Sequence, residues 1–91
     1  MEMLDGIQAI LYPNPTNNKV FLVLASQTGS LVDVQLELYD IDGRYLSRLF
    51  QKDVLTGGDV QEIPLPNLSS GVYVYKLSSK NGSVNGKLIV E

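Results

Sequence analysis

The side chains of this chain that could do chemistry are acids and tyrosines, because the sequence contains no His and no Cys. Their absence removes the usual general base near neutral pH, the nucleophilic thiol and the commonest zinc ligands. The acids that stand closest together form two pairs, Asp33 with Glu37 and Asp59 with Glu62. A pair of carboxylates can act as acid and base when a cleft holds both beside a substrate, which a sandwich of 91 residues rarely supplies. Each pair is interpreted as the solvated face of a strand or loop, and no catalytic residue and no cofactor are predicted.

The segment Asp40–Gly43 has the composition of the first residues of a calcium loop. A complete loop of that kind needs further oxygen ligands, a Glu at its twelfth position and flanking helices. Arg44 follows at once, and no stretch of the chain favours a helix. The segment is therefore interpreted as a hairpin turn in which Gly43 supplies a positive φ, and no metal site is predicted.

Five tyrosines offer a different chemistry, the stacking of aromatic rings on sugars. Tyr73 and Tyr75 fall on one face of a predicted strand, and Tyr12, Tyr39 and Tyr45 add to them. A tyrosine that is half-buried with its hydroxyl at the surface is the commoner arrangement. The sugar platform is kept as part of an alternative function, an immunoglobulin-like accessory module that binds carbohydrate or spaces domains in a secreted enzyme or adhesin.

Composition indicates one small globular domain. The chain has 91 residues, of which 44% are hydrophobic and 19% charged. The net charge is −3, and the seven Lys and Arg are scattered without a basic stripe, which argues against nucleic acid as a partner. No run approaches the ~20 apolar residues of a membrane helix, so no membrane insertion is predicted.

The elements that must position these residues are strands, because the apolar residues recur with a period of two. Val32, Val34, Leu36 and Leu38, for example, alternate with polar neighbours and define an inner face. Pro64 places its strand at a sheet edge or at the strand's end. Gly71 is predicted to have a positive φ, and Asn81-Gly82 predicts a hairpin. The predicted strands cover residues 8–12, 19–24, 32–39, 44–51, 60–65, 72–78 and 84–90. About seven strands at this spacing predict an all-β, antiparallel, immunoglobulin-like β-sandwich.

Four segments, taken in order, resemble a known family. They are Tyr12-Pro13-Asn14-Pro15, Leu38–Arg44, Ile63–Tyr73 and the closing Lys87–Val90. Their order and spacing resemble the C-terminal sorting domain of proteins exported by the bacterial type IX secretion system. The residues assigned to its structural motifs are Tyr12, Pro13, Asn14, Pro15, Asp40 and Gly43. Both prolines fix φ and hold the preceding residues extended, which gives a stiff bend before the first long strand.

The resemblance implies a non-enzyme that serves as an address label. Residues 9–91 would be the sorting domain, and residues 1–8 a linker remnant or residues added for expression. The domain would direct an N-terminal cargo through the periplasm to the outer-membrane translocon, and then to the cell surface or the medium. Implied partners are the translocon, its shuttle components and a sortase-like peptidase that normally cleaves the domain from the cargo.

The resemblance also implies where the machinery reads the domain. A terminal strand often lies at a sheet edge with unpaired backbone groups, where a partner can add a strand. The same edge could pair two copies in a dimer. The residues expected to be recognised are Lys87, Leu88, Ile89, Val90 and Glu91, and more weakly Gly71, Val72 and Tyr73.

Overall fold

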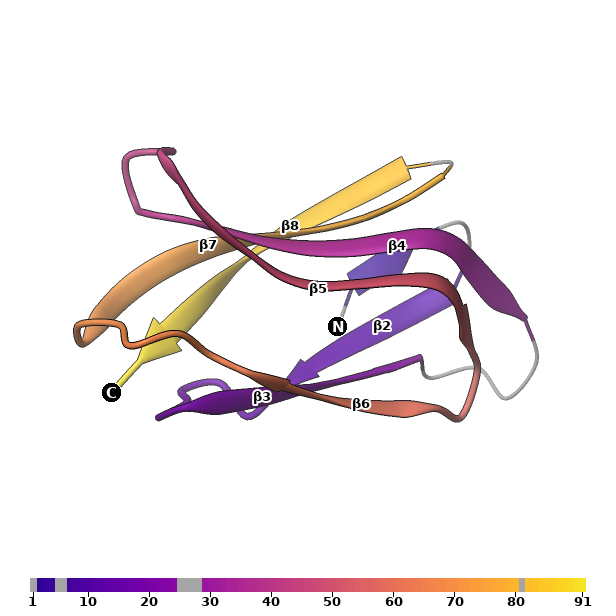
Figure 1. Cartoon of the computed structure of the whole chain (residues 1–91), viewed down its shortest axis with the longest axis horizontal. Coiled ribbons are helices and arrows are strands. Elements are labelled where there is room, and N and C mark those ends of the chain that lie inside the picture. The colour runs from indigo at the N-terminus through magenta and orange to yellow at the C-terminus, as the bar shows by residue number, and fades with distance from the viewer. Residues whose placement is uncertain (1, 5–6, 25–28, 81) are drawn as a thin grey trace.

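The chain folds into two four-stranded sheets, and every strand pair in them is antiparallel. The computed structural model describes residues 2–4, 7–24, 29–80 and 82–91. Sheet A has the order β1-β2-β3-β6, formed by β1 (Glu2–Leu4), β2 (Ile7–Tyr12), β3 (Lys19–Leu24) and β6 (Val60–Pro64). Sheet B has the order β5-β4-β7-β8, formed by β4 (Ser30–Tyr39), β5 (Tyr45–Thr56), β7 (Gly71–Ser79) and β8 (Gly82–Val90). The sheets are the two layers of a sandwich (Figure 1).

The predicted all-β, immunoglobulin-like sandwich is confirmed, and the seven predicted strands correspond to β2 through β8. The main difference in length is in β5, which continues to Thr56 because Leu55 pairs with Leu31 at the start of β4. The short strand β1 is additional and lies within the segment predicted to be a linker. Met1, Asp5 and Gly6 of that segment lie outside the described residues, and the linker assignment stays a prediction.

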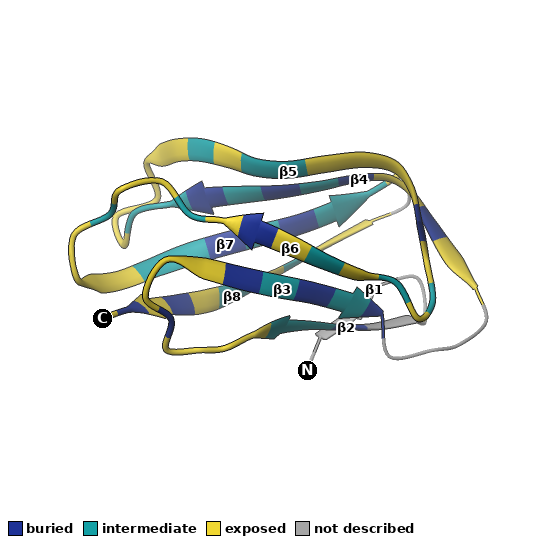
Figure 2. Cartoon of the chain, turned by 60° about the horizontal axis from the view of Figure 1, so that its bottom comes forward, coloured by how far each residue is buried: buried dark blue, intermediate teal, exposed yellow. Residues whose placement is uncertain are grey.

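The core lies between the sheets and consists of side chains from their inner faces (Figure 2). Leu22 of β3 and Leu36 and Leu38 of β4 are each at most 1% exposed. Burying one such side chain contributes about 1.5–3 kcal/mol relative to leaving it in water. The apolar residues that recur with a period of two therefore define the strands, and their burial stabilises this small domain.

The alternation predicted for β4 is confirmed from Val34 onward and wrong at Val32. Val32 is 43% exposed, whereas Leu31 and Val34 are buried. Between them Asp33 has a φ of +56°, a left-handed conformation that Asp tolerates better than most residues. This local change of backbone direction puts two residues, instead of one, between successive inward side chains.

Several predicted turns and edges are also confirmed. Pro64 is the last residue of β6, and β6 is an edge strand of sheet A. Gly43 and Gly71 have positive φ values, +90° and +158°. β7 and β8 form the predicted hairpin, but Ser79 is opposite Gly82, so Gly82 begins β8 instead of lying in the turn; Asn81 itself lies outside the described residues.

Candidate functional site

The first and the last motif of the sequence are in contact, because the side chain of Asn14 forms hydrogen bonds with the backbone of β8. The Asn14 side-chain Nδ2 donates to the Lys87 carbonyl at 2.8 Å. The Ile89 N–H donates to Asn14 Oδ1 at 2.9 Å. One side-chain amide thus offers β8 the donor and the acceptor that a neighbouring strand would offer. Both prolyl bonds of the motif, Tyr12-Pro13 and Asn14-Pro15, are cis.

Thr16 continues this pairing toward the C-terminus. Its N–H donates to the Ile89 carbonyl at 2.8 Å, and its carbonyl accepts from the Glu91 N–H at 2.9 Å. Its hydroxyl donates to the Lys19 carbonyl, and the residue is only 2% exposed. The segment from Asn14 to Thr16, here called the Asn14–Thr16 clasp, lies in the loop between β2 and β3, beside the end of β8 (Figures 1 and 2).

The clasp corrects one expectation about the terminal strand. β8 is an edge strand of sheet B, as predicted. Its outer backbone groups from Lys87 to Glu91 are nevertheless paired, by Asn14 and Thr16, so the expectation of unpaired groups there is wrong. A partner cannot add a strand along this stretch without first displacing the clasp.

The terminal recognition candidates divide between core and surface. Leu88 is fully buried and Val90 is 3% exposed, so both belong to the core. Lys87, Ile89 and Glu91 are exposed. Successive residues of a strand point to opposite faces of the sheet. The segment therefore contributes two side chains to the core and three to the surface.

The second group of candidates lies directly beside the first. In the register of β7 and β8, Gly71 pairs with Val90, Val72 with Ile89 and Tyr73 with Leu88. Val72 is 41% exposed on the outer face. Tyr73 is half-buried on the inner face and donates its hydroxyl to the Ser69 carbonyl at 2.6 Å. The structure therefore brings the two predicted segments together, with Val72 and Ile89 adjacent at the surface.

The motif residues Asp40 and Gly43 build the hairpin between β4 and β5. Asp40 Oδ1 accepts from the N–H groups of Asp42, at 3.0 Å, and of Arg44, at 2.8 Å. Its Oδ2 lies 3.1 Å from Arg44 Nε. The carboxylate is thus used to close the turn, as the hairpin interpretation requires.

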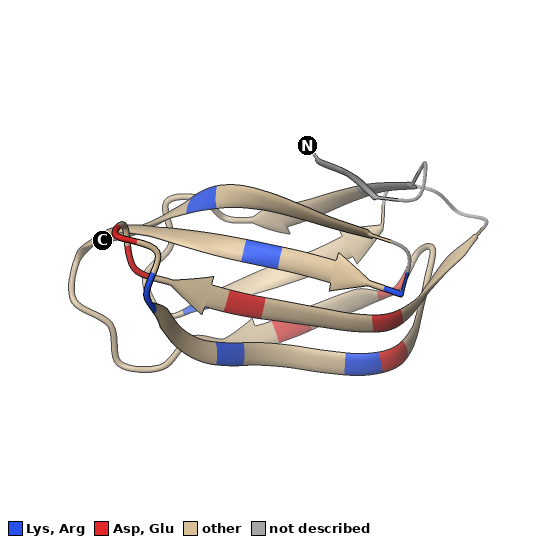
Figure 3. Cartoon of the chain, turned by 90° about the horizontal axis from the view of Figure 1, so that it is seen from above, with Lys and Arg blue, Asp and Glu red and all other residues tan. Residues whose placement is uncertain are grey.

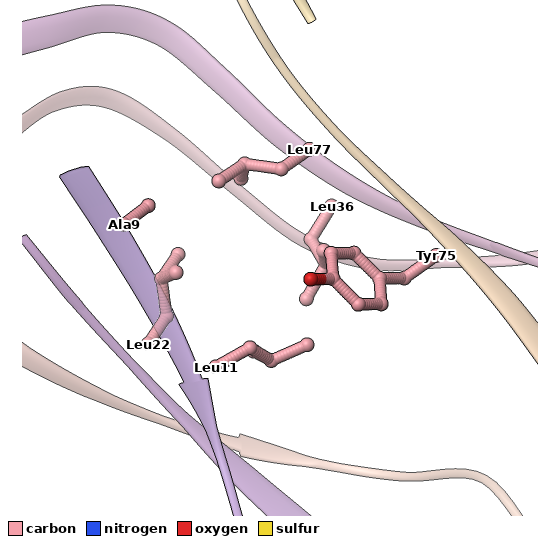
Figure 4. Close-up of a pocket in the computed structure, with 6 residues that line it drawn as sticks. All are labelled: Ala9, Leu11, Leu22, Leu36, Tyr75 and Leu77. Carbon is pink, nitrogen blue, oxygen red and sulfur yellow. The ribbon is translucent and has the colours of Figure 1, made fainter. Parts of the chain in front are cut away.

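The tyrosines do not form a sugar platform on β7, because the shared face of Tyr73 and Tyr75 points into the sandwich. Tyr75 is 8% exposed and lines a gap of about 10 Å³ between the sheets, with Leu36 and Leu77 among its neighbours (Figure 4). That volume holds about one water molecule, so the gap is a packing defect and not a binding site. On the outer face, desolvation and the neighbouring Glu37 carboxylate raise the pKa of Tyr39.

The two acids of the pair Asp59 and Glu62 make separate structural contacts. Asp59 accepts a hydrogen bond from the Thr56 hydroxyl at 3.0 Å, and Glu62 forms an exposed ion pair with Lys19 at 2.8 Å. Within the described ranges, no group of three or more Asp, Glu, His or Cys could hold a metal ion. The part of the chain that the structure describes also has no helix long and apolar enough to cross a membrane.

Two residues of this region were missed by the sequence reasoning, Thr16 and Gly86. Gly86 faces Tyr75 across the strands, and a Cβ there would lie 2.5 Å from the ring atom Cζ. The pair is brought together by the register in which Ser79 is opposite Gly82; a two-residue Asn81-Gly82 loop would instead place Tyr75 opposite Leu88, so counting outward from the predicted turn does not find it. Thr16 carries no local signal either, because its backbone partners, Ile89 and Glu91, are more than seventy residues away.

The comparison with protein families identifies the family of this chain. The family model described as secretion system C-terminal sorting domain matches residues 10–91. The chain belongs to the C-terminal sorting domain family of type IX secretion. The comparisons with curated proteins and with solved structures returned no match.

Membership in this family fixes the function at the level of the domain. A sorting domain is a C-terminal signal that directs a cargo protein through type IX secretion, toward the cell surface or the extracellular space. It implies an N-terminal cargo and the machinery of that system as partners, and the family is not an enzyme family. The accessory carbohydrate-binding module is not favoured.

Proposed function

We propose that the export machinery recognises this sorting domain in its folded form, through the exposed side chains of the terminal strand and its neighbour. The proposal narrows the expected recognition residues to Lys87 and Ile89 on β8 and Glu91 directly after it, with Val72 beside them on β7. Leu88, Val90 and Tyr73 then act by holding these side chains in place. The single observation that carries the proposal is the Asn14–Thr16 clasp, which pairs the backbone of β8 and leaves its outward side chains exposed.

In this proposal residues 9–91 are a non-catalytic adaptor, and residues 1–8 lead from the cargo. The folded domain crosses the periplasm with its cargo, engages the shuttle components and the translocon, and is then removed by a sortase-like peptidase. The clasp confines an edge-to-edge dimer through β8 to the part of the strand that precedes Lys87.

The experiment fuses the chain to the C-terminus of a Sec-targeted fluorescent reporter. The fusion is expressed in a bacterium with a working type IX system and in a strain that lacks the translocon. Reporter at the surface or in the medium of the first strain only is the expected result. Periplasmic retention of an intact, folded fusion in both strains would contradict the proposal.

Surface substitutions locate the signal better than a truncation does. Deleting Lys87–Glu91 also removes Leu88 and Val90 from the core, so a loss of export would not separate recognition from unfolding. The variant Ile89→Ser removes an exposed side chain and keeps the core. Its matched control is Val54→Ser, which removes a side chain of similar exposure on β5 (47% against 41%). Export should fall for Ile89→Ser and persist for Val54→Ser.

A further inference from the structure

The outer face of sheet A carries a contiguous apolar patch. The register of the sheet places Ile10, Val23 and Val60 in one row across β2, β3 and β6. Tyr12 and Phe21 are opposite each other in the same register, and their rings stack with the centroids 5.4 Å apart. Tyr12 is 39% exposed and Val60 54%, and the other three side chains are half-buried. These five residues are here called the sheet A patch, and such a cluster of aliphatic and aromatic side chains on one face is typical of a contact surface.

The three strands of the patch carry no unpaired charge. β2, β3 and β6 contain two charged residues, Lys19 and Glu62. These two form an ion pair with each other, 2.8 Å from Lys19 Nζ to Glu62 Oε1, and the Lys19 Nζ also lies 5.6 Å from the centroid of the Phe21 ring. Sheet B is different, because each of its four strands carries charged residues (Figure 3). The sheet A patch therefore offers a partner apolar contact without net charge.

The polypeptide enters the domain beside this patch. β1 is the edge strand of sheet A next to β2, and Glu2 of β1 pairs with Ala9, the residue before Ile10 (Figure 2). Because neighbouring strands lie about 5 Å apart, the entry point is about one strand spacing from the patch. Membership in the sorting-domain family implies that a cargo precedes the domain. A partner joined by a short tether has an effective concentration of about 1 mM, so even a weak apolar contact with it is populated.

The lack of net charge favours a tethered partner over one that arrives by diffusion. Complementary charge mainly accelerates encounter and excludes wrong partners, and a neutral face does neither. A tether makes both less necessary, because it keeps one partner always close. Docking on sheet A also leaves the residues proposed for recognition free, since Val72, Lys87 and Ile89 belong to sheet B, the other layer of the sandwich (Figure 1).

We propose that the sheet A patch docks onto an apolar surface of the cargo that precedes it in the same polypeptide. The five side chains of the patch pack against aliphatic and aromatic side chains of the cargo. The docked domain then presents sheet B, with the residues proposed for recognition, to the surroundings. This inference goes beyond the proposed function, because the occupant of the patch is the cargo and not the export machinery.

The test compares the solvent access of two tyrosines by hydroxyl-radical footprinting with mass spectrometry. The domain alone is compared with the parent polypeptide, in which the cargo precedes it. Tyr12 reports on the patch, and Tyr45, which is 52% exposed on β5 of sheet B, is the matched control. At an effective concentration of about 1 mM, a contact with a Kd of about 0.5 mM is occupied about two thirds of the time. Modification of Tyr12 should therefore be about threefold lower in the parent polypeptide, and that of Tyr45 unchanged.

Two charge-matched variants of the parent polypeptide show whether the patch itself makes the contact. Val60→Glu puts a carboxylate into the patch, and Val54→Glu makes the same change on β5 at similar exposure, 47% against 54%. Val60→Glu should raise Tyr12 modification to the level of the domain alone, and Val54→Glu should leave it low. In the domain alone, both variants should keep the circular dichroism spectrum of the unmodified domain.

Three results would overturn the proposal. The first is equal modification of Tyr12 in the domain alone and in the parent polypeptide. The second is a protection of Tyr12 that Val60→Glu leaves unchanged. The third is a protection that already grows with the concentration of the domain alone, which would assign the patch to a second copy. No step of the test involves export, so its result is independent of the proposed function.

Discussion

Replacing Asn14 by Ala is the most direct perturbation of the link between the two ends of the chain. The substitution removes one donor, to the Lys87 carbonyl, and one acceptor, from the Ile89 N–H. A typical intramolecular hydrogen bond contributes about 0.5–1.5 kcal/mol net. The two bonds lie at the surface, where water can replace the lost partner, so the expected cost is toward the lower part of their sum, about 1–2 kcal/mol. In a domain of this size that lowers the Tm by roughly 5–15 °C.

The assay is urea denaturation followed by circular dichroism, together with amide hydrogen exchange. Asn17→Ala is the control, because Asn17 is exposed in the same loop and its side chain makes no hydrogen bond within the described residues. The control should change the free energy of unfolding by less than about 0.5 kcal/mol. In Asn14→Ala the amide of Ile89 should exchange faster, while that of Leu77 in the core changes only with global stability.

A further variant, Asn14→Asp, separates the two hydrogen bonds. The carboxylate can still accept from the Ile89 N–H, but it places a negative oxygen against the Lys87 carbonyl where Asn14 had a donor. Its cost should be at least that of Asn14→Ala. If Asn14→Ala matched Asn17→Ala in stability and left Ile89 exchange unchanged, the clasp would not be what closes the edge of β8, and the reasoning built on it would be refuted.

Three other substitutions test the packing and the turns. Gly86→Ala should cost about 1–3 kcal/mol because its Cβ meets the Tyr75 ring, and most of that cost should vanish in a Tyr75→Leu background; a double-mutant cycle by denaturation checks this, and an undiminished cost would exclude the ring as its cause. Asp40→Ala should cost about 1–3 kcal/mol through loss of the charged acceptor that closes the β4–β5 hairpin, measured by the same denaturation; a neutral effect would mean that the turn closes without it. Leu36→Ala should cost about 2–5 kcal/mol, against less than about 0.5 kcal/mol for the exposed Val54→Ala, and similar values for the two would contradict the assignment of inner and outer faces.

The strands were predictable because a sheet that is buried on one face has apolar residues at every second position of its strands. That rule failed at Val32, since a single backbone conformation at Asp33 changes which side chains point inward and leaves no mark in the hydrophobic pattern. A left-handed backbone conformation of an Asp inside a strand can be read from the structure but not from the sequence pattern. The predicted turns, by contrast, depend on the residues of the turn itself, which is why Gly43 and Gly71 were placed correctly.

The region proposed for recognition was only partly predictable, for a different reason. The motif residues were found as separate segments, and β7 was placed beside β8 by their hairpin. Nothing local indicates that Asn14 reaches a strand 73 residues away in sequence. Such contacts depend on how the two sheets are stacked, and one sequence carries no pairwise signal for that. The division of Lys87–Glu91 into core and surface residues could have been inferred from strand alternation, because the buried and exposed positions simply alternate.

The closed end of β8 also lowers the aggregation hazard that a terminal edge strand with exposed apolar residues would otherwise pose. An open edge strand with exposed apolar residues such as Ile89 invites pairing with any other edge, including that of a second copy. The Asn14–Thr16 clasp satisfies the outer backbone groups from Lys87 to Glu91 and removes this unspecific mode of binding. Only the side chains then remain to distinguish a partner. Because Leu88 and Val90 anchor the same strand in the core, those side chains are held in place only when the domain is folded, and the recognition proposed above therefore requires the folded domain.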